Sequence, residues 1–164
     1  VTDDIYGVEI AGALKNVIAI AAGMSDGLGF GDNTKGALLA RGLNEMARIG
    51  LALGARIETY LGIAGVGDLF ATANSQLSRN YRVGYGLGQG KSMHSILADI
   101  GQVAEGVPTT DLAVNLAYKL GIEVPITTVV QSVMRGTLEP RSAVWQLMER
   151  TPKHEGFQPI AKKL

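Results

Sequence analysis

The sequence predicts an all-α fold, a bundle of about seven to nine helices, and three observations support that prediction. Apolar residues recur at three- and four-residue intervals along nearly the whole chain, which is the period of an amphipathic helix. Proline opens three of these segments, at a position where a helix tolerates it. The 164 residues are 46% apolar and 18% charged, as in one globular domain. We expect that domain to cover residues 1–150 and a polar tail to follow over 151–164.

The first segment, residues 3–23, predicts one long helix that begins with two aspartates. Their negative charges suit a helix N-terminus, and Gly23 is a plausible stop. Residues 7–24 approach the length of a membrane span, but a glutamate, a lysine and an asparagine interrupt them. We therefore expect a buried core helix and no membrane span.

The middle of the chain alternates helices with short loops. Residues 25–33 contain too much glycine for anything but a loop, and Gly54 ends the long helix that follows this loop. Ser78 and Ser92 are candidate N-caps of two further helices. The helices are expected over 34–53, around 57–62, and over 68–74, 79–88 and 93–99.

Three segments that begin with proline complete the predicted fold. The middle one is rich in β-branched residues, which favours a strand. Its apolar residues nonetheless follow helical intervals, so we predict a helix there as well. The three helices are expected over 108–120, 125–135 and 140–149.

The composition excludes several classes of function. Lys and Arg together number 15, as do Asp and Glu, so no excess charge points to nucleic acid as a partner. Cysteine is absent and the two histidines, His94 and His154, lack metal-ligand spacing, so we expect neither a disulfide nor a metal site. The lack of cysteine is consistent with a reducing cytoplasm.

Lys15 stands out because it lies in the middle of the apolar first segment, beside Asn16. A buried ammonium group is costly unless it is paired or used. Lys15 could extend past the edge of a close helix packing, or it could be a functional group, and we expect it to be buried and partnered. Its neighbours on the same helix face are all small: Ala11, Gly12, Ala19 and Ala22.

A second group of polar residues lies between residues 65 and 80. Asp68 and Thr72 are four apart and share a helix face, while Ser78, Arg79 and Asn80 come together at a helix start. Free N–H groups at a helix N-terminus and an arginine fork suit an oxyanion or a phosphate. An ordinary capped helix with a solvated arginine is the alternative.

Two glycine-containing motifs are less informative. "GLGFGD" lacks the spacing and the preceding strand of a dinucleotide-binding fingerprint, so a tight turn between helices is the better interpretation. Glu105 lies between glycines in "GQVAEG", which by itself indicates a turn with a solvated carboxylate.

Taken together, the motifs resemble the C-terminal domain of bacterial-type NAD(P)-dependent glycerol-3-phosphate dehydrogenase. The resemblance covers about residues 5–150. It implies an all-α, substrate-binding domain like those of 6-phosphogluconate dehydrogenase-like enzymes, with the N-terminal Rossmann domain absent from this chain. The motifs, in order, are "GALKN", "GMSDGLGFGDN", "RGLNEMARIG", "GIAGVGDL", "SRN", "LGQG" and "GQVAEG".

The resemblance also implies roles for individual residues. Lys15 matches the proton acceptor. The family's cofactor contacts fall on Arg79, Val103 and Glu105, and NAD or NADP would be bound mainly by the absent domain. Substrate contacts fall on Lys15, Asp68, Ser78, Arg79 and Asn80, and more loosely, through eukaryotic relatives, on Asn16 and Thr72.

The reaction that the resemblance implies is the interconversion of dihydroxyacetone phosphate and sn-glycerol 3-phosphate by hydride transfer, which supplies a glycerophospholipid precursor. The chain alone is expected to be inactive, because it lacks most of the cofactor site. The expected partners are the substrate, the protein's own Rossmann domain and, as an open question, a second copy in a homodimer. A non-catalytic all-α dimerisation or binding module remains the alternative. The dehydrogenase domain requires Lys15, Asp68 and Arg79 to converge on one cleft, whereas a non-catalytic module does not.

Overall fold

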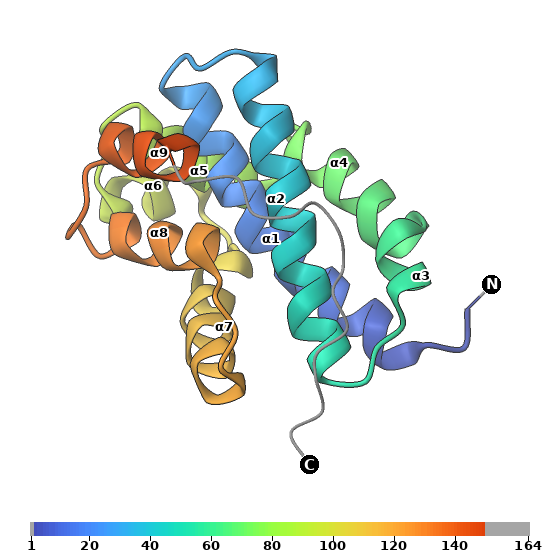
Figure 1. The fold of residues 1–164 in the computed structure, drawn as a ribbon. Helices are drawn as coiled ribbons and strands as arrows, with labels where there is room; N and C mark the ends of the chain where they lie inside the picture. The colour runs from blue at the N-terminus through green and yellow to red at the C-terminus, as the bar shows by residue number, and fades with distance from the viewer. Residues whose placement is uncertain (1, 150–164) are drawn as a thin grey trace.

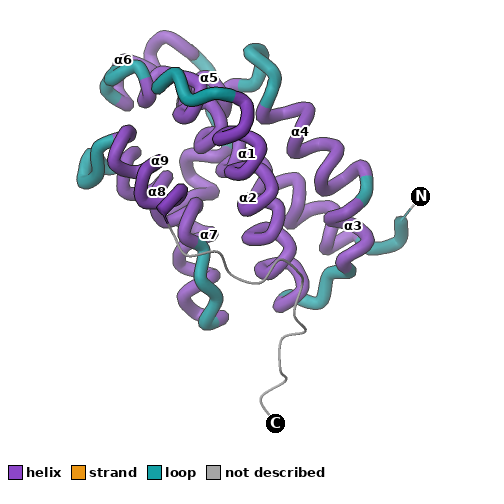
Figure 2. Tube along the Cα trace, turned by 45° about the horizontal axis from the view of Figure 1, so that its top comes forward, coloured by secondary structure: helices purple, strands orange, loops and turns teal. Residues whose placement is uncertain are grey.

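The structure, a computed structural model, describes residues 2–149, and these residues form helices and loops without a strand (Figures 1 and 2). The all-α prediction is confirmed for this part of the chain, and the predicted tail at 151–164 lies outside the described residues. The α-helices are α1 (Ile5–Gly27), α2 (Asp32–Ala52), α3 (Ile57–Leu61), α4 (Asp68–Ala73), α5 (Arg79–Gly88), α6 (Met93–Ile100), α7 (Gly106–Leu120), α8 (Pro125–Met134) and α9 (Pro140–Glu149), with a π-helix, η1 (Ile63–Gly67), before α4.

Helix α1 is the centre of the bundle. It contacts α2, α4, α5, α7 and α8, and Figure 1 shows it running through the middle of the molecule. Every residue from Val17 to Met24 is buried. By length and composition α1 could cross a membrane, but 50% of its most apolar window is buried inside the bundle. Burial among other helices is what the core helix of a bundle shows.

Helix α1 runs past its predicted stop at Gly23 and continues to Gly27, so the predicted loop over 25–33 shrinks to four residues, 28–31. The reason is close packing. A Cβ atom at Gly23 or Gly27 would overlap a main-chain carbonyl oxygen of α5, and one at Gly84 would overlap a carbonyl oxygen of α1. The glycines therefore let the two backbones touch, and the tertiary contact stabilises a helix that local propensity would end. Gly29, with a φ of 77°, makes the turn that follows.

Most of the predicted helix ends are confirmed. The hydroxyl oxygens of Ser78 and Ser92 accept main-chain N–H groups in the first turns of α5 and α6, at 3.3 and 3.2 Å. The β-branched segment is helical, and proline is the first residue of both α8 and α9. Pro108 is the third residue of its helix, because α7 already begins at Gly106. The π-helix was not predicted from the sequence.

Glu45 of α2 caps α8 from the side, and it is only 2% exposed. Its carboxylate accepts the N–H groups of Ile126 and Thr127 at 2.6 and 3.1 Å, and the Thr127 hydroxyl at 3.0 Å. Burial raises the pKa of Glu45 to about 7, although these hydrogen bonds favour the charged form. A helix N-terminus inside the core thus has a charged or neutral cap depending on pH.

We expect the stability of the protein to fall as Glu45 loses its proton. Between the usual pKa of a glutamate and about 7, the folded state holds a proton that the unfolded chain has released, so rising pH favours unfolding. From about pH 5 to pH 8, the free energy of unfolding should fall by about 2–3 kcal/mol more in the wild type than in Glu45→Gln. Urea unfolding of both proteins at the two pH values checks this. Parallel pH profiles would contradict it.

Candidate active site

Lys15 and Asp68 form an ion pair between α1 and α4. The Lys15 side chain is 19% exposed and that of Asp68 is 40% exposed. The Thr72 hydroxyl, one turn further along α4, donates a hydrogen bond to the other carboxylate oxygen of Asp68 at 3.3 Å. Lys15 is therefore largely buried and has a partner, with its ammonium group held in a fixed direction.

The π-helix that precedes Asp68 sets where this carboxylate lies. Turns of this kind are rare and are frequent at functional sites, because they shift the following side chains round the helix axis. Here Gly65 packs directly on Tyr60, where a Cβ atom would overlap the tyrosine's main chain. Only glycine fits at that position, so the sequence "GIAGVGD" is suited to this local geometry.

A pocket of about 420 Å³ opens beside the ion pair, between α1, α4 and the start of α5. Most of the predicted substrate residues line this pocket. Asp68 does not line it, but it forms an ion pair with Lys15, which does. Three further lining residues, Ala71, Ser75 and Leu77, were missed by the sequence analysis, because their types carry no chemical signal. The predicted residues that line the pocket are Lys15, Asn16, Thr72, Ser78, Arg79 and Asn80.

The first turn of α5 supplies the positive side of this pocket. Ser78 uses its hydroxyl oxygen as the N-cap, so its side chain is already committed to the helix. Arg79 is exposed and forms no ion pair with any carboxylate in residues 2–149. Its guanidinium donates a hydrogen bond to Gln102 at 3.3 Å. Because Lys15 is neutralised by Asp68, Arg79 is the charge in this pocket that is available to an anion.

The loop that carries Val103 and Glu105 lies next to α5 but not in the pocket itself. Asn80 is 8% exposed, and its side-chain oxygen accepts the N–H of Gly106 at 2.8 Å. Together with the Arg79–Gln102 hydrogen bond, this contact ties both ends of the loop to α5. Val103 is 63% exposed and Glu105 is also exposed, and neither lines the pocket.

Comparison with known proteins identifies the family. Residues 4–145 match the family described as "NAD-dependent glycerol-3-phosphate dehydrogenase C-terminus". The chain belongs to this family. It is 54% identical over 152 residues to the glycerol-3-phosphate dehydrogenase [NAD(P)+] of Geobacillus thermodenitrificans, covering 93% of this chain and 44% of the relative. With the enzyme of that name from Dechloromonas aromatica it is 54% identical over 153 residues, covering 93% and 46%.

Solved structures agree with the family assignment. The crystal structure of the glycerol-3-phosphate dehydrogenase of Coxiella burnetii matches with a TM-score of 0.88 and 44% identity, over 91% of this chain and 46% of that one. A yeast glycerol-3-phosphate dehydrogenase matches with a TM-score of 0.80 and 30% identity, over 90% and 43%. The chain thus spans about half the length of the relatives it matches.

Proposed function

We propose that this chain is the substrate-binding and catalytic half of an NAD(P)-dependent sn-glycerol-3-phosphate dehydrogenase, which acts in the cytoplasm. The observation that carries the proposal is one pocket lined by both Arg79 and Lys15, the partner of Asp68, in a chain of this family. A proton donor and an anion anchor on one pocket suit a phosphorylated ketone. A purely structural helical module gives no reason for these groups to converge.

Lys15 is the proposed proton-transfer residue. Reduction of dihydroxyacetone phosphate leaves negative charge on the oxygen at carbon 2, and an ammonium group beside that oxygen stabilises the charge and supplies the proton. In the oxidation direction the neutral amine takes the proton back. Asp68 holds the lysine, and Thr72 in turn holds Asp68. The ion pair therefore orients the donor before substrate enters.

Arg79 is the proposed anchor for the substrate phosphate. Its planar fork matches phosphate oxygens, and the N–H groups of the first turn of α5 add to the positive potential. The acceptor of the hydrogen bond from Arg79 is the neutral, exposed amide of Gln102, so a phosphate dianion is the stronger partner. Binding at this end of the substrate places the ketone next to Lys15.

We expect Arg79→Ala to raise the KM for dihydroxyacetone phosphate about ten- to hundredfold, because a charge-assisted hydrogen bond to phosphate is lost. The turnover number should change less, since Lys15 is untouched. Steady-state kinetics of the full-length enzyme checks this. The control is Arg135→Ala, which removes the exposed arginine that follows α8 and pairs with Asp111. An unchanged KM would argue against the anchor.

The loop between α6 and α7 fits a nicotinamide dinucleotide that reaches over from the other half of the protein. Val103 presents an exposed apolar side chain, and Arg79 offers a cation to phosphate oxygens. The Arg79–Gln102 and Asn80–Gly106 hydrogen bonds between α5 and the loop hold Val103 and Arg79 in place. When bound, the cofactor supplies the hydride of the reaction. Val103, Glu105 and Arg79 would position it against the substrate pocket.

We further propose that the active protein contains a Rossmann domain N-terminal to this chain, and that the 164-residue chain alone has no turnover. The length of the relatives supports this, since the chain covers less than half of each one quoted above. The placement of α1 as the core helix supports the absence of a membrane span.

The test is an assay of the full-length polypeptide that contains this chain. Oxidation of NADH or NADPH is followed with dihydroxyacetone phosphate as substrate, and unphosphorylated dihydroxyacetone serves as the control. We expect turnover that depends on the phosphate. A polypeptide that ignores dihydroxyacetone phosphate with both cofactors would refute the proposed function.

A further inference from the structure

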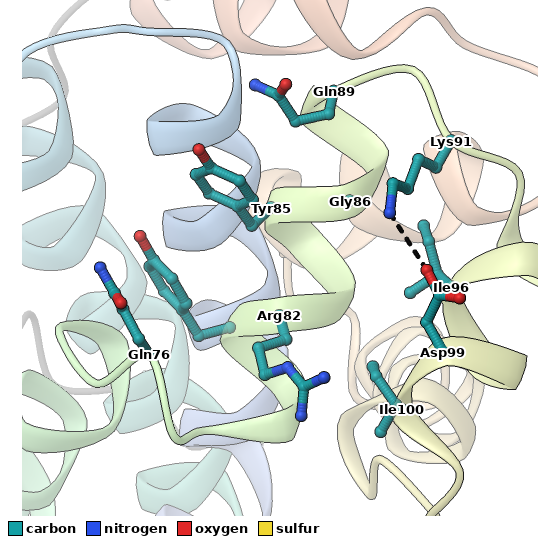
Figure 3. Close-up of a pocket in the computed structure, with 10 residues that line it drawn as sticks. Gln76, Arg82, Tyr85, Gly86, Gln89, Lys91, Ile96, Asp99 and Ile100 are labelled. Carbon is teal, nitrogen blue, oxygen red and sulfur yellow. Dashed lines mark hydrogen bonds and ion pairs between the residues drawn. The ribbon is translucent and has the colours of Figure 1, made fainter.

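A second pocket, of about 500 Å³, lies on the outer side of α5, against α6 (Figure 3). None of its lining residues lines the pocket of Lys15 and Arg79, and the proposed reaction uses none of them. Figure 3 shows Arg82, Tyr85 and Gln89 extending from α5 and its C-cap, while Lys91 reaches across to Asp99 of α6. The volume of this pocket falls in the range of small-molecule sites, about 300–1,000 Å³.

The polar side of this pocket carries a net positive charge. Lys91 and Asp99 form an ion pair at 3.1 Å and neutralise each other. Arg82 is exposed, and within the described residues it forms no ion pair. The guanidinium is therefore available to a ligand, and its planar fork matches carboxylate or phosphate oxygens. The amide of Gln76 adds hydrogen-bonding groups of both kinds, whereas the amide nitrogen of Gln89 already donates to the carbonyl oxygen of Gly27.

The other side of the pocket is apolar and aromatic. Because Gly86 has no side chain, Ile96 packs directly on α5, with its Cγ1 2.7 Å from where a Cβ atom would lie. Tyr85 is 44% exposed and stacks on Tyr81, at 6.2 Å between ring centroids. The Tyr81 hydroxyl donates to Asp26 at 2.8 Å, which fixes the inner ring. The outer ring, Tyr85, thus offers a supported aromatic surface to a ligand.

We propose that this pocket binds a small organic anion that carries a phosphate or carboxylate group on a planar ring. Arg82 holds the anionic group, the exposed ring of Tyr85 contacts the ligand ring, and the Gln76 amide orients it. The pocket shares α5 with the proposed phosphate anchor: Arg79 and Arg82 lie one helical turn apart. The binding inference does not depend on the reaction proposed above, because its test measures binding and not turnover.

The test is a calorimetric titration of the full-length polypeptide with phenyl phosphate and with benzoate. We expect at least one of them to bind with a Kd of about 1 mM or tighter, and the one that binds identifies the anionic group. Inorganic phosphate, which lacks the ring, should bind at least about tenfold more weakly. Arg82→Gln should weaken binding at least about tenfold, and Tyr85→Leu should weaken it to a smaller extent.

Two variants outside the pocket, Arg135→Gln and Arg79→Gln, locate the binding. Arg135→Gln removes an exposed arginine that pairs with Asp111 and lines neither pocket, so it should leave the Kd unchanged. Circular dichroism confirms that each variant is folded. The proposal is overturned if neither ligand binds. This includes the case in which the other half of the polypeptide covers the pocket. It is also overturned if Arg82→Gln binds like the wild type, if Arg79→Gln and not Arg82→Gln abolishes binding, or if inorganic phosphate binds as tightly as the ring-bearing ligands.

Discussion

Replacing Lys15 by methionine in the full-length enzyme is expected to lower kcat by about 10³-fold or more, with a change of less than about fivefold in the KM for dihydroxyacetone phosphate. Methionine keeps much of the side-chain volume but cannot donate a proton or stabilise charge. In the proposed mechanism Arg79 still binds the phosphate, so we expect affinity to be largely kept. Steady-state kinetics at saturating cofactor measures both constants.

Two comparisons make this result specific to proton transfer. Lys119→Met removes an exposed lysine from the last turn of α7 and should leave kcat unchanged. Asp68→Asn removes the partner that orients Lys15, so it should lower kcat by less than Lys15→Met does. A Lys15→Met enzyme that melts like the wild type and keeps more than about a tenth of its kcat would rule Lys15 out as the proton donor.

Replacing Gly84 by alanine is expected to destabilise the protein by about 3 kcal/mol or more, a loss of roughly 6–12 °C in Tm. The added Cβ would overlap the main-chain carbonyl oxygen of Ile20, which cannot rotate away as a side chain can. To relieve the overlap, α1 and α5 must separate along their whole contact. Thermal unfolding followed by circular dichroism measures the effect.

The matched control is Gly36→Ala in α2. Gly36 is also inside a helix, but no atom lies within 4 Å of the position of its Cβ. Alanine there should stabilise the protein by up to about 1 kcal/mol, because it loses less conformational entropy than glycine on folding. If Gly84→Ala and Gly36→Ala shifted Tm in the same direction, close packing would not explain the glycines of α5.

Helices and caps could be predicted from the sequence because their signals are local. The three- and four-residue spacing of apolar residues depends on neighbours within a few turns, as do the serine caps of α5 and α6. The end of α1 could not be predicted in this way. Gly23 looks like a stop from its own propensity, yet its role is to admit a backbone that lies about 60 residues further along the chain.

In the candidate site, too, local signals could be recognised from the sequence and long-range contacts could not. Lys15 could be singled out because a charge in an apolar helix is anomalous by itself. Its pairing with Asp68 is consistent with the expectation of a partner, although the π-helix that places Asp68 was missed. Gln102 could not be recognised, because an exposed glutamine has no distinctive environment until the fold brings Arg79 beside it. The buried position of Asn80 likewise depends on Gly106, which is remote in sequence.

The glycine contact between α1 and α5 has a consequence for how this protein can vary. Lys15 belongs to α1 and Arg79 to α5, so main-chain atoms, and not interchangeable core side chains, set the spacing of the two helices that carry them. We expect exchanges of apolar residues elsewhere in the bundle to lower stability without changing the spacing of α1 and α5. Changes in the rest of the core are therefore expected to alter stability more than the spacing of Lys15 and Arg79, whereas loss of a glycine of the contact is expected to alter both.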